Sequence, residues 1–87
     1  MTEETALTFP CEFPIKVMGL NTDSFENEIF MIANQQVPNL GESAIRSRPS
    51  SSAKYLSVTI TINAHSREQL DNLYLAFNKH PDVKMVL

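Results

Sequence analysis

The segment from Tyr55 to Asn63, with the sequence Tyr-Leu-Ser-Val-Thr-Ile-Thr-Ile-Asn, constrains the fold more than any other part of the chain. Apolar and polar residues alternate along it without interruption. Strict alternation predicts a β-strand with one buried and one polar face, because successive side chains point to opposite sides of a strand. The β-branched residues that fill most of the segment favour the same structure. We therefore expect the rest of the chain to pack against this strand.

The chain has 87 residues, enough for one domain with one modest core. Its apolar content of 43% and charged content of 20% are those of a globular protein rather than a disordered one. A net charge of −3 gives no overall attraction to nucleic acid or anionic lipid, so such binding would need a local basic patch. Cys11 is the single cysteine, which favours a reducing compartment over a secreted, disulfide-bonded protein.

Residues 1–11 are expected to form a frayed acidic leader, and residues 12–87 a single domain. The first nine residues contain two glutamates and no basic residue, so neither a signal peptide nor a transit peptide is predicted. No window has the length and apolar character of a transmembrane helix, and we expect no membrane association. These features together predict a cytoplasmic bacterial protein.

Hydrophobic periodicity predicts six elements in the order strand, helix, strand, strand, helix, strand. The strands are expected near residues 13–18, 42–48, 55–63 and 83–87, and the helices near 23–37 and 66–79. Gly19 is expected to end the first strand. Asp23 with Glu26, and Ser66 with Gln69, resemble capping boxes at the two helix starts.

This order of elements is that of the α+β, ferredoxin-like βαββαβ fold. The fold is a four-stranded antiparallel sheet with two helices on one face, since right-handed crossovers place both helices on the same side. The first and third strands are then expected in the centre of the sheet, and the second and fourth at its edges.

Strand parity divides the side chains of the sheet between two faces. The face expected under the helices carries Ile15, Val17, Ile45, Leu56, Val58, Ile60, Ile62, Val83 and Met85. The opposite face carries Lys16, Met18, Arg46, Arg48, Tyr55, Ser57, Thr59, Thr61, Lys84 and Val86, which include four of the seven Lys and Arg residues. Two interpretations are open. The face is either a solvated surface of the kind that antiparallel sheets often have, or an interface for self-association or an anionic partner.

The turn between the second and third strands is also polar and basic. Hydroxyl, amide and guanidinium groups in such a loop could hold a phosphate or a carboxylate, and the alternative is a mobile polar loop. The groups around it belong to Arg46, Arg48, Ser50, Ser51, Ser52 and Lys54. A glycine-rich phosphate loop is not present, because Gly19 and Gly41 are the only glycines.

The sequence contains no recognisable catalytic or metal-binding set. His65 and His80 lie far apart, and neither has a second histidine or a cysteine at metal-ligand spacing. Cys11 has no base or orienting group that the sequence can place beside it, as a nucleophile would require. We therefore expect no enzyme, no metal and no cofactor, and we assign no catalytic residue.

Several short motifs resemble those of a known family. They are Lys-Val-Met-Gly at 16–19, Pro-Ser-Ser at 49–51, Ser-Val-Thr-Ile-Thr-Ile-Asn-Ala at 57–64, Leu-Tyr at 73–74 and Val-Lys-Met-Val-Leu at 83–87. On these motifs the chain resembles the YbeD-like family of small uncharacterised bacterial proteins, over about residues 13–87. The resemblance implies a ferredoxin-like fold close to the ACT-type regulatory domains, which bind small ligands, often amino acids, between paired copies.

The resemblance also implies a ligand site in the loop after the first strand. In ACT domains that bind ligands, this loop commonly has a Pro-Gly pair that lets backbone amides reach the ligand. Here Gly19 matches in position, but the pair is missing. Gly19, Asn21 and Thr22 are the candidate ligand residues of this loop.

These observations together predict a non-enzymatic regulatory or interaction module. It would pair with itself or with a partner protein and could bind a small anionic metabolite. The candidate ligand or interface residues are Lys16, Gly19, Asn21, Thr22, Arg46, Arg48, Ser50, Ser51, Lys54, Tyr55 and Lys84. The alternative is a nucleic-acid-binding domain that uses the same basic face. That alternative is less favoured, because ferredoxin-like RNA binders stack bases on two or three sheet aromatics and this face has only Tyr55.

Overall fold

Strand β3, Tyr55–Ala64, pairs along both of its edges in an antiparallel sheet of order β2-β3-β1-β4. The computed structural model describes residues 9–38 and 40–87. The other elements are β1 (Cys11–Leu20), α1 (Phe25–Gln36), a 3₁₀ helix (Glu42–Ala44), β2 (Ile45–Pro49), α2 (Arg67–Asn78) and β4 (Val83–Val86). Strands β1 and β3 are central, and β2 and β4 form the edges. The predicted order of the elements, and the predicted places of the four strands in the sheet, are therefore confirmed.

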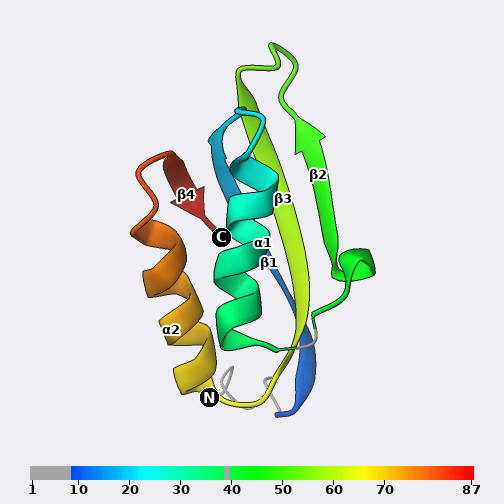
Figure 1. The fold of residues 1–87 in the computed structure, drawn as a ribbon. Coiled ribbons are helices and arrows are strands. Elements are labelled where there is room, and N and C mark those ends of the chain that lie inside the picture. The colour runs from blue at the N-terminus through cyan, green and yellow to red at the C-terminus, as the bar shows by residue number, and fades with distance from the viewer. Residues whose placement is uncertain (1–8, 39) are drawn as a thin grey trace, which may run out of the picture.

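Both helices cover the same face of the sheet and leave the other face open (Figure 1). The core lies between the two layers. It consists of Ile15, Val17, Phe25, Ile29, Ala33, Leu56, Val58, Ile60, Ile62, Ala64, Leu70, Leu73 and Phe77. All four apolar residues that alternate along the 55–63 segment belong to this core. Burial of this apolar surface is the main stabilising contribution to a domain of this size.

Three predicted element boundaries were wrong. The segment expected as a strand from Glu42 begins with a 3₁₀ helix, and β2 runs instead from Ile45 to Pro49. Gly19 does not end the first strand, because β1 continues through it to Leu20. Cys11, which was assigned to the leader, is the first residue of β1 and pairs with Ala64. Residues 1–8 of the expected leader lie outside the described residues.

The predicted faces of Met85 and Val86 were wrong because β4 contains an irregularity, whereas Val83 packs against the core as expected. Met18 pairs with Met85, while the adjacent Gly19 pairs with Val83, so Lys84 is an extra residue in the ladder. An extra residue reverses the alternation of the side chains beyond it. Met85 therefore lies opposite Met18 and is 48% exposed, while Val86 packs against the core.

The two helices begin in different ways. At α2, the Ser66 hydroxyl accepts a hydrogen bond from the Gln69 amide at 3.1 Å, as the capping box predicts. The Gln69 side chain reaches back one residue further than expected and accepts from the His65 amide at 2.8 Å. At α1, the N-cap residue is Ser24, and its side chain makes no capping bond. The predicted capping box of Asp23 and Glu26 was therefore wrong.

Candidate functional site

Three cations lie beside the hydroxyl-bearing residues Ser57 and Thr59 on the open sheet face. Lys16 of β1 and Arg46 of β2 both pair with Thr59, from its two sides. Because neighbouring strands lie about 4.8 Å apart, Lys16 and Arg46 stand about 10 Å apart with Thr59 between them. Arg48 is the cross-strand partner of Ser57, which lies two residues before Thr59 in β3. Lys16, Arg46 and Arg48 are called the basic cluster below.

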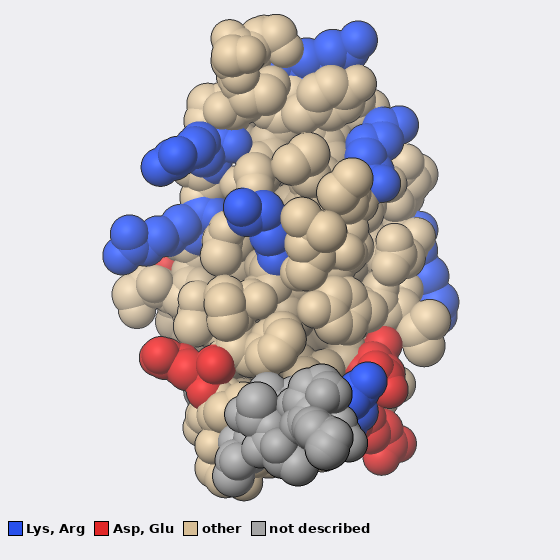
Figure 2. Space-filling model, turned by 180° about the vertical axis from the view of Figure 1, so that it is seen from behind, with Lys and Arg blue, Asp and Glu red and all other residues tan. Residues whose placement is uncertain are grey.

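The basic cluster lines a hollow of about 750 Å³ that is partly open to solvent. Its lining residues are the three cations with Ser47, Ser57 and Thr59. All three cations are exposed. Within residues 9–38 and 40–87, no carboxylate lies within 4.0 Å of any of them. On this face, blue Lys and Arg side chains occupy the upper and middle parts, and red Asp and Glu side chains lie mainly toward the lower end (Figure 2).

A second hollow, of about 250 Å³, adjoins the first and shares Lys16, Arg48 and Ser57 with it. Its other lining residues are Met18, Pro49, Ser50 and Tyr55, so its surface is mostly apolar. Met85 extends the apolar surface toward β4, because it is the cross-strand partner of Met18. Met18, Pro49, Tyr55 and Met85 are called the apolar patch below. The open face therefore has a charged half and an apolar half side by side.

The hairpin between β2 and β3 uses most of its polar groups within itself. The Ser50 hydroxyl accepts from the Tyr55 amide at 3.2 Å, and the Ser52 hydroxyl accepts from the Lys54 amide at 3.4 Å. The Ala53 amide donates to the Ser50 carbonyl at 2.8 Å. These amides are therefore not free to hold an anion, although Ser51 is exposed at the tip. The Lys54 ammonium lies 5.7 Å from the centre of the Tyr55 ring, at the edge of the apolar patch.

The loop after β1 is likewise occupied by internal contacts. A Cβ atom on Gly19 would lie 2.4 Å from Cζ of Phe25 and 2.5 Å from the Asp82 carbonyl oxygen. The Asn21 side-chain amide donates to the Ala53 carbonyl at 2.9 Å, and the Thr22 carbonyl accepts from the Phe25 amide at 3.3 Å. Gly19 therefore makes room for the core and Asn21 ties the loop to the hairpin. Neither residue joins the basic cluster.

Lys84 is exposed at the bulge of β4, at the opposite edge of the sheet from Arg46 and Arg48. Of the candidate residues, the structure thus brings together Lys16, Arg46, Arg48 and Tyr55, with Ser50 at the margin of the same surface.

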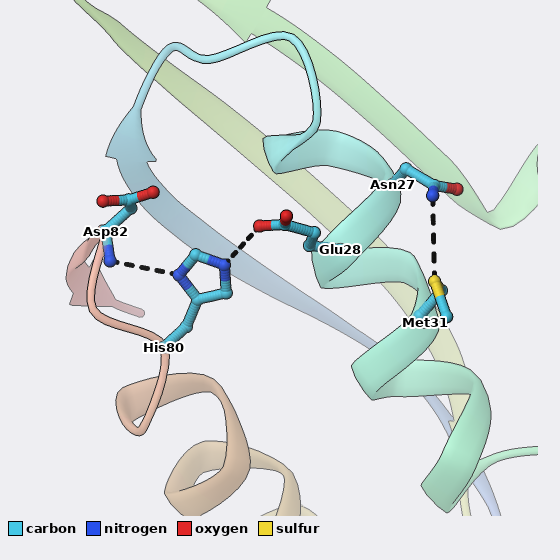
Figure 3. A network of polar contacts seen from close by, with 5 residues as sticks. All are labelled: Asn27, Glu28, Met31, His80 and Asp82. Carbon is cyan, nitrogen blue, oxygen red and sulfur yellow. Dashed lines mark hydrogen bonds and ion pairs between the residues drawn. The ribbon is translucent and has the colours of Figure 1, made fainter.

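A polar contact between α1 and the α2–β4 connection has no counterpart among the predictions. The His80 ring accepts a hydrogen bond at Nδ1 from the Asp82 amide, at 3.1 Å. Its Nε2 therefore carries the proton and donates to Oε1 of Glu28 at 2.6 Å (Figure 3). The His80 ring also packs edge-on against Phe25, with centroids 5.5 Å apart.

This contact stabilises the charged form of Glu28. The hydrogen bond from His80, and secondarily one from Ser24, lowers the pKa of the Glu28 carboxyl below its ordinary value of 4.5. The contact joins residues that are 52 positions apart in the sequence, and no local motif marks such a pair. Both ring nitrogens of His80 make hydrogen bonds within the protein, so the contact joins α1 to the α2–β4 connection.

The sequence predictions also missed part of the candidate surface. Ser57 and Thr59 were placed on the open face by strand parity but were not selected as site residues. Met85 was placed on the wrong face because the bulge in β4 leaves no signal in the local sequence.

The described residues contain no group of three or more His, Cys, Asp or Glu side chains placed to hold a metal ion. Among the helices of that part of the chain, none is long and apolar enough to cross a membrane. The open face offers cations and hydroxyl groups next to a mostly apolar surface.

Comparison with known proteins places the chain in a family. The family model described as "Protein of unknown function (DUF493)" matches residues 4–87. A UPF0250 protein of Janthinobacterium sp. (strain Marseille) is 50% identical over 84 residues, which are 97% of this chain and 92% of that protein. UPF0250 protein NE1487 of Nitrosomonas europaea is 42% identical over 87 residues and the full length of both chains.

Among solved structures, the solution structure of protein HP0495 from H. pylori matches with a TM-score of 0.75. The match covers 93% of this chain and 85% of that one, at 12% sequence identity, and so supports the fold alone. The ferredoxin-like fold and the YbeD-like resemblance are both confirmed. The chain therefore belongs to the DUF493 family, the UPF0250 proteins of bacteria.

Proposed function

We propose that this protein is a non-enzymatic interaction module whose open sheet face binds an acidic segment of a partner protein in the cytoplasm. The observation that supports the proposal is the basic cluster. Lys16, Arg46 and Arg48 line one hollow, and no carboxylate of the described residues lies within 4.0 Å of them. A concentration of one charge on a protein that is acidic overall favours partners of opposite charge and steers their approach.

The shape of the surface favours a protein segment over a small metabolite. Sites for small molecules are concave and bury most of the ligand. The two hollows on the open face are partly open to solvent, and they adjoin because they share Lys16, Arg48 and Ser57. An extended segment can follow such a surface, whereas a small anion would stay largely hydrated on it.

The charge of the face also disfavours one form of self-association. Two copies that met with their basic clusters in contact would bring like charges together, and like charges across an interface are unfavourable. Pairing with a second copy through this face therefore has less support than binding an acidic partner.

A direct test is a titration of the isotope-labelled protein with a blocked hexaglutamate peptide, followed by amide NMR shifts. We expect the largest shifts at residues 46–48 and 57–59. Replacement of both Arg46 and Arg48 by Gln should weaken binding about two- to thirtyfold, since both side chains are exposed and each exposed ion pair contributes about 0.2–1 kcal/mol. Binding should also weaken as salt is raised.

The matched control replaces Arg67 and Lys79 by Gln. Arg67 is the first residue of α2 and Lys79 is its C-cap, in the other layer of the molecule, and the change in net charge is the same. Equal losses of affinity in the two double variants would contradict a specific site. A short single-stranded oligothymidine serves as the competing ligand. If it binds the basic cluster more tightly than the peptide at about 0.15 M salt, the nucleic-acid alternative is correct instead.

A further inference from the structure

We infer that the acidic segment carries a bulky apolar side chain close to its acids, which lies against the apolar patch. This inference rests on the proposed function, because it specifies the partner of the same surface. The supporting observation is the division of the open face. The hollow of the basic cluster adjoins a hollow lined by Met18, Pro49 and Tyr55, and Met85 lies opposite Met18.

The spacing of the two halves follows from strand geometry. Thr59, Ser57 and Tyr55 point to the same side of β3, and alternate residues along a strand are about 7 Å apart. The centre of the basic cluster is therefore about 7–14 Å from Tyr55. An extended peptide along β3 has the same repeat, so an apolar residue two or four positions from an acid reaches the apolar patch while the acid contacts the cations.

The residue types of the apolar patch suit this role. Met85 is 48% exposed, and Met18 and Tyr55 are partly buried in the sheet surface. Methionine side chains adapt to the shape of a partner, and tyrosine offers a large contact area at low entropic cost. Exposed ion pairs alone add little net affinity. The apolar contact would therefore supply much of the affinity, while the basic cluster selects acidic partners and orients them.

The experiment uses three blocked hexapeptides and the full chain. The first has glutamate at its first and third positions and phenylalanine at its fifth, with glycine elsewhere. The second has alanine in place of phenylalanine, and the third has glutamine in place of both glutamates. We expect the first peptide to bind about tenfold more tightly than the second, as burial of part of an aromatic side chain would give. The third should bind more weakly than the first.

The methyl resonances of the two methionines report the site directly. With the phenylalanine peptide we expect ring-current shifts of the Met18 and Met85 methyl groups, and with the alanine peptide much smaller ones. Met85→Ser should reduce the affinity for the phenylalanine peptide several-fold and that for the alanine peptide much less. Leu75→Ser is the matched control, because Leu75 is 63% exposed on α2 and should affect neither peptide.

The possible failures are distinct. If the phenylalanine and alanine peptides bind equally well at the basic cluster, the inference is wrong and the proposed function stands. If neither glutamate peptide binds at millimolar concentration, the proposed function fails and the inference fails with it. Ring-current shifts that appear only at Leu75 or elsewhere on the helices would place the apolar contact outside the open face and would also overturn the inference.

Discussion

Gly19 shows how a single missing side chain allows the two layers to meet. Phe25 lies at the start of α1, and its ring occupies the space where a Cβ on Gly19 would be, beside the Asp82 carbonyl. Neither the Asp82 backbone nor the fully buried Phe25 ring can move aside without loss of stability, since protein interiors are close-packed. The sequence marked Gly19 as special, but the expected reasons were a turn and access for a ligand. The actual reason is a contact between segments distant in the sequence.

We expect Gly19→Ala to lower the free energy of unfolding by about 1–3 kcal/mol, because it overpacks the Phe25 contact. The measurement is urea unfolding followed by circular dichroism. Gly41→Ala is the control, since the nearest atom to its added Cβ would be the Ser43 Oγ at 3.9 Å. Similar losses in the two variants would show that the cost arises from backbone conformation rather than from packing.

The Glu28–His80 contact makes part of the stability depend on pH. The pKa of Glu28 is lower in the folded protein than its ordinary value of 4.5, chiefly because His80 donates a hydrogen bond to the carboxylate. Folding therefore favours the ionised form. The resulting stabilisation is fully present above pH 4.5 and is lost as the pH falls through the lower, folded-state value.

We expect Glu28→Gln to be less stable than the wild type at neutral pH, with the difference shrinking in acid below the folded-state pKa. Urea unfolding at a series of pH values measures it. Glu26→Gln is the matched control on the same helix, because no ion pair to Glu26 exists among the described residues. A difference between wild type and Glu28→Gln that stays constant down to acid pH would contradict the assigned role of the carboxylate.

At the level of elements, the two helix starts differ in how much of their structure is local. The start of α2 is specified within five residues, by Ser66, Gln69 and the His65 amide. The sequence motif therefore predicted it correctly. The start of α1 has no side-chain cap, and its position depends on Phe25, the first residue of the helix. The Phe25 side chain is fully buried and lies against Gly19 and His80. No motif of a few residues contains that information.

Removing the cap of α2 should therefore lower the free energy of unfolding more than removing Asp23, which was wrongly predicted to cap α1. We expect Ser66→Ala to reduce the free energy of unfolding by about 1 kcal/mol, because the Gln69 amide loses its acceptor. Asp23→Ala should change it by less than about half of that. Thermal and urea unfolding of the two variants measure the difference. A larger effect at Asp23 would mean that its carboxylate caps α1 in solution.

The strands show the same contrast between local and distant determinants. Alternation along β3 correctly assigned its two faces, because a regular strand needs no information from its neighbours. Alternation failed in β4, where the extra residue Lys84 reverses the faces of Met85 and Val86. The apolar patch depends on this reversal, since it brings Met85 beside Met18. Strand parity thus placed the basic cluster, Met18 and Tyr55 on the open face, whereas the position of Met85 depended on the register between β1 and β4.

At the level of the whole molecule, stability depends on a single core. For 87 residues the free energy of unfolding is expected to be roughly 4–13 kcal/mol. Both helices and the sheet contribute residues to the core, so a substitution that disrupts packing in one element destabilises the others. A domain of this kind should unfold in one cooperative step.

We expect Phe77→Ala to lower the free energy of unfolding by about 3–5 kcal/mol, because Phe77 is fully buried and a cavity would remain. Leu75→Ala on the same helix should change it by less than about 0.5 kcal/mol, since Leu75 is 63% exposed. Urea unfolding measures both. Loss of the helix signal before the sheet signal in Phe77→Ala would contradict a single cooperative unit.

The sequence by itself determined the order of the elements, the apolar row of β3, the cap of α2 and the presence of cations on the open face. These follow from local periodicity and short-range hydrogen bonds, which a few neighbouring residues specify. The tertiary structure decided how Lys16, Arg46 and Arg48 surround Thr59 and Ser57, which face Met85 takes, why position 19 is glycine, and that His80 meets Glu28. These depend on register and packing between distant segments, because only the folded chain brings those atoms together.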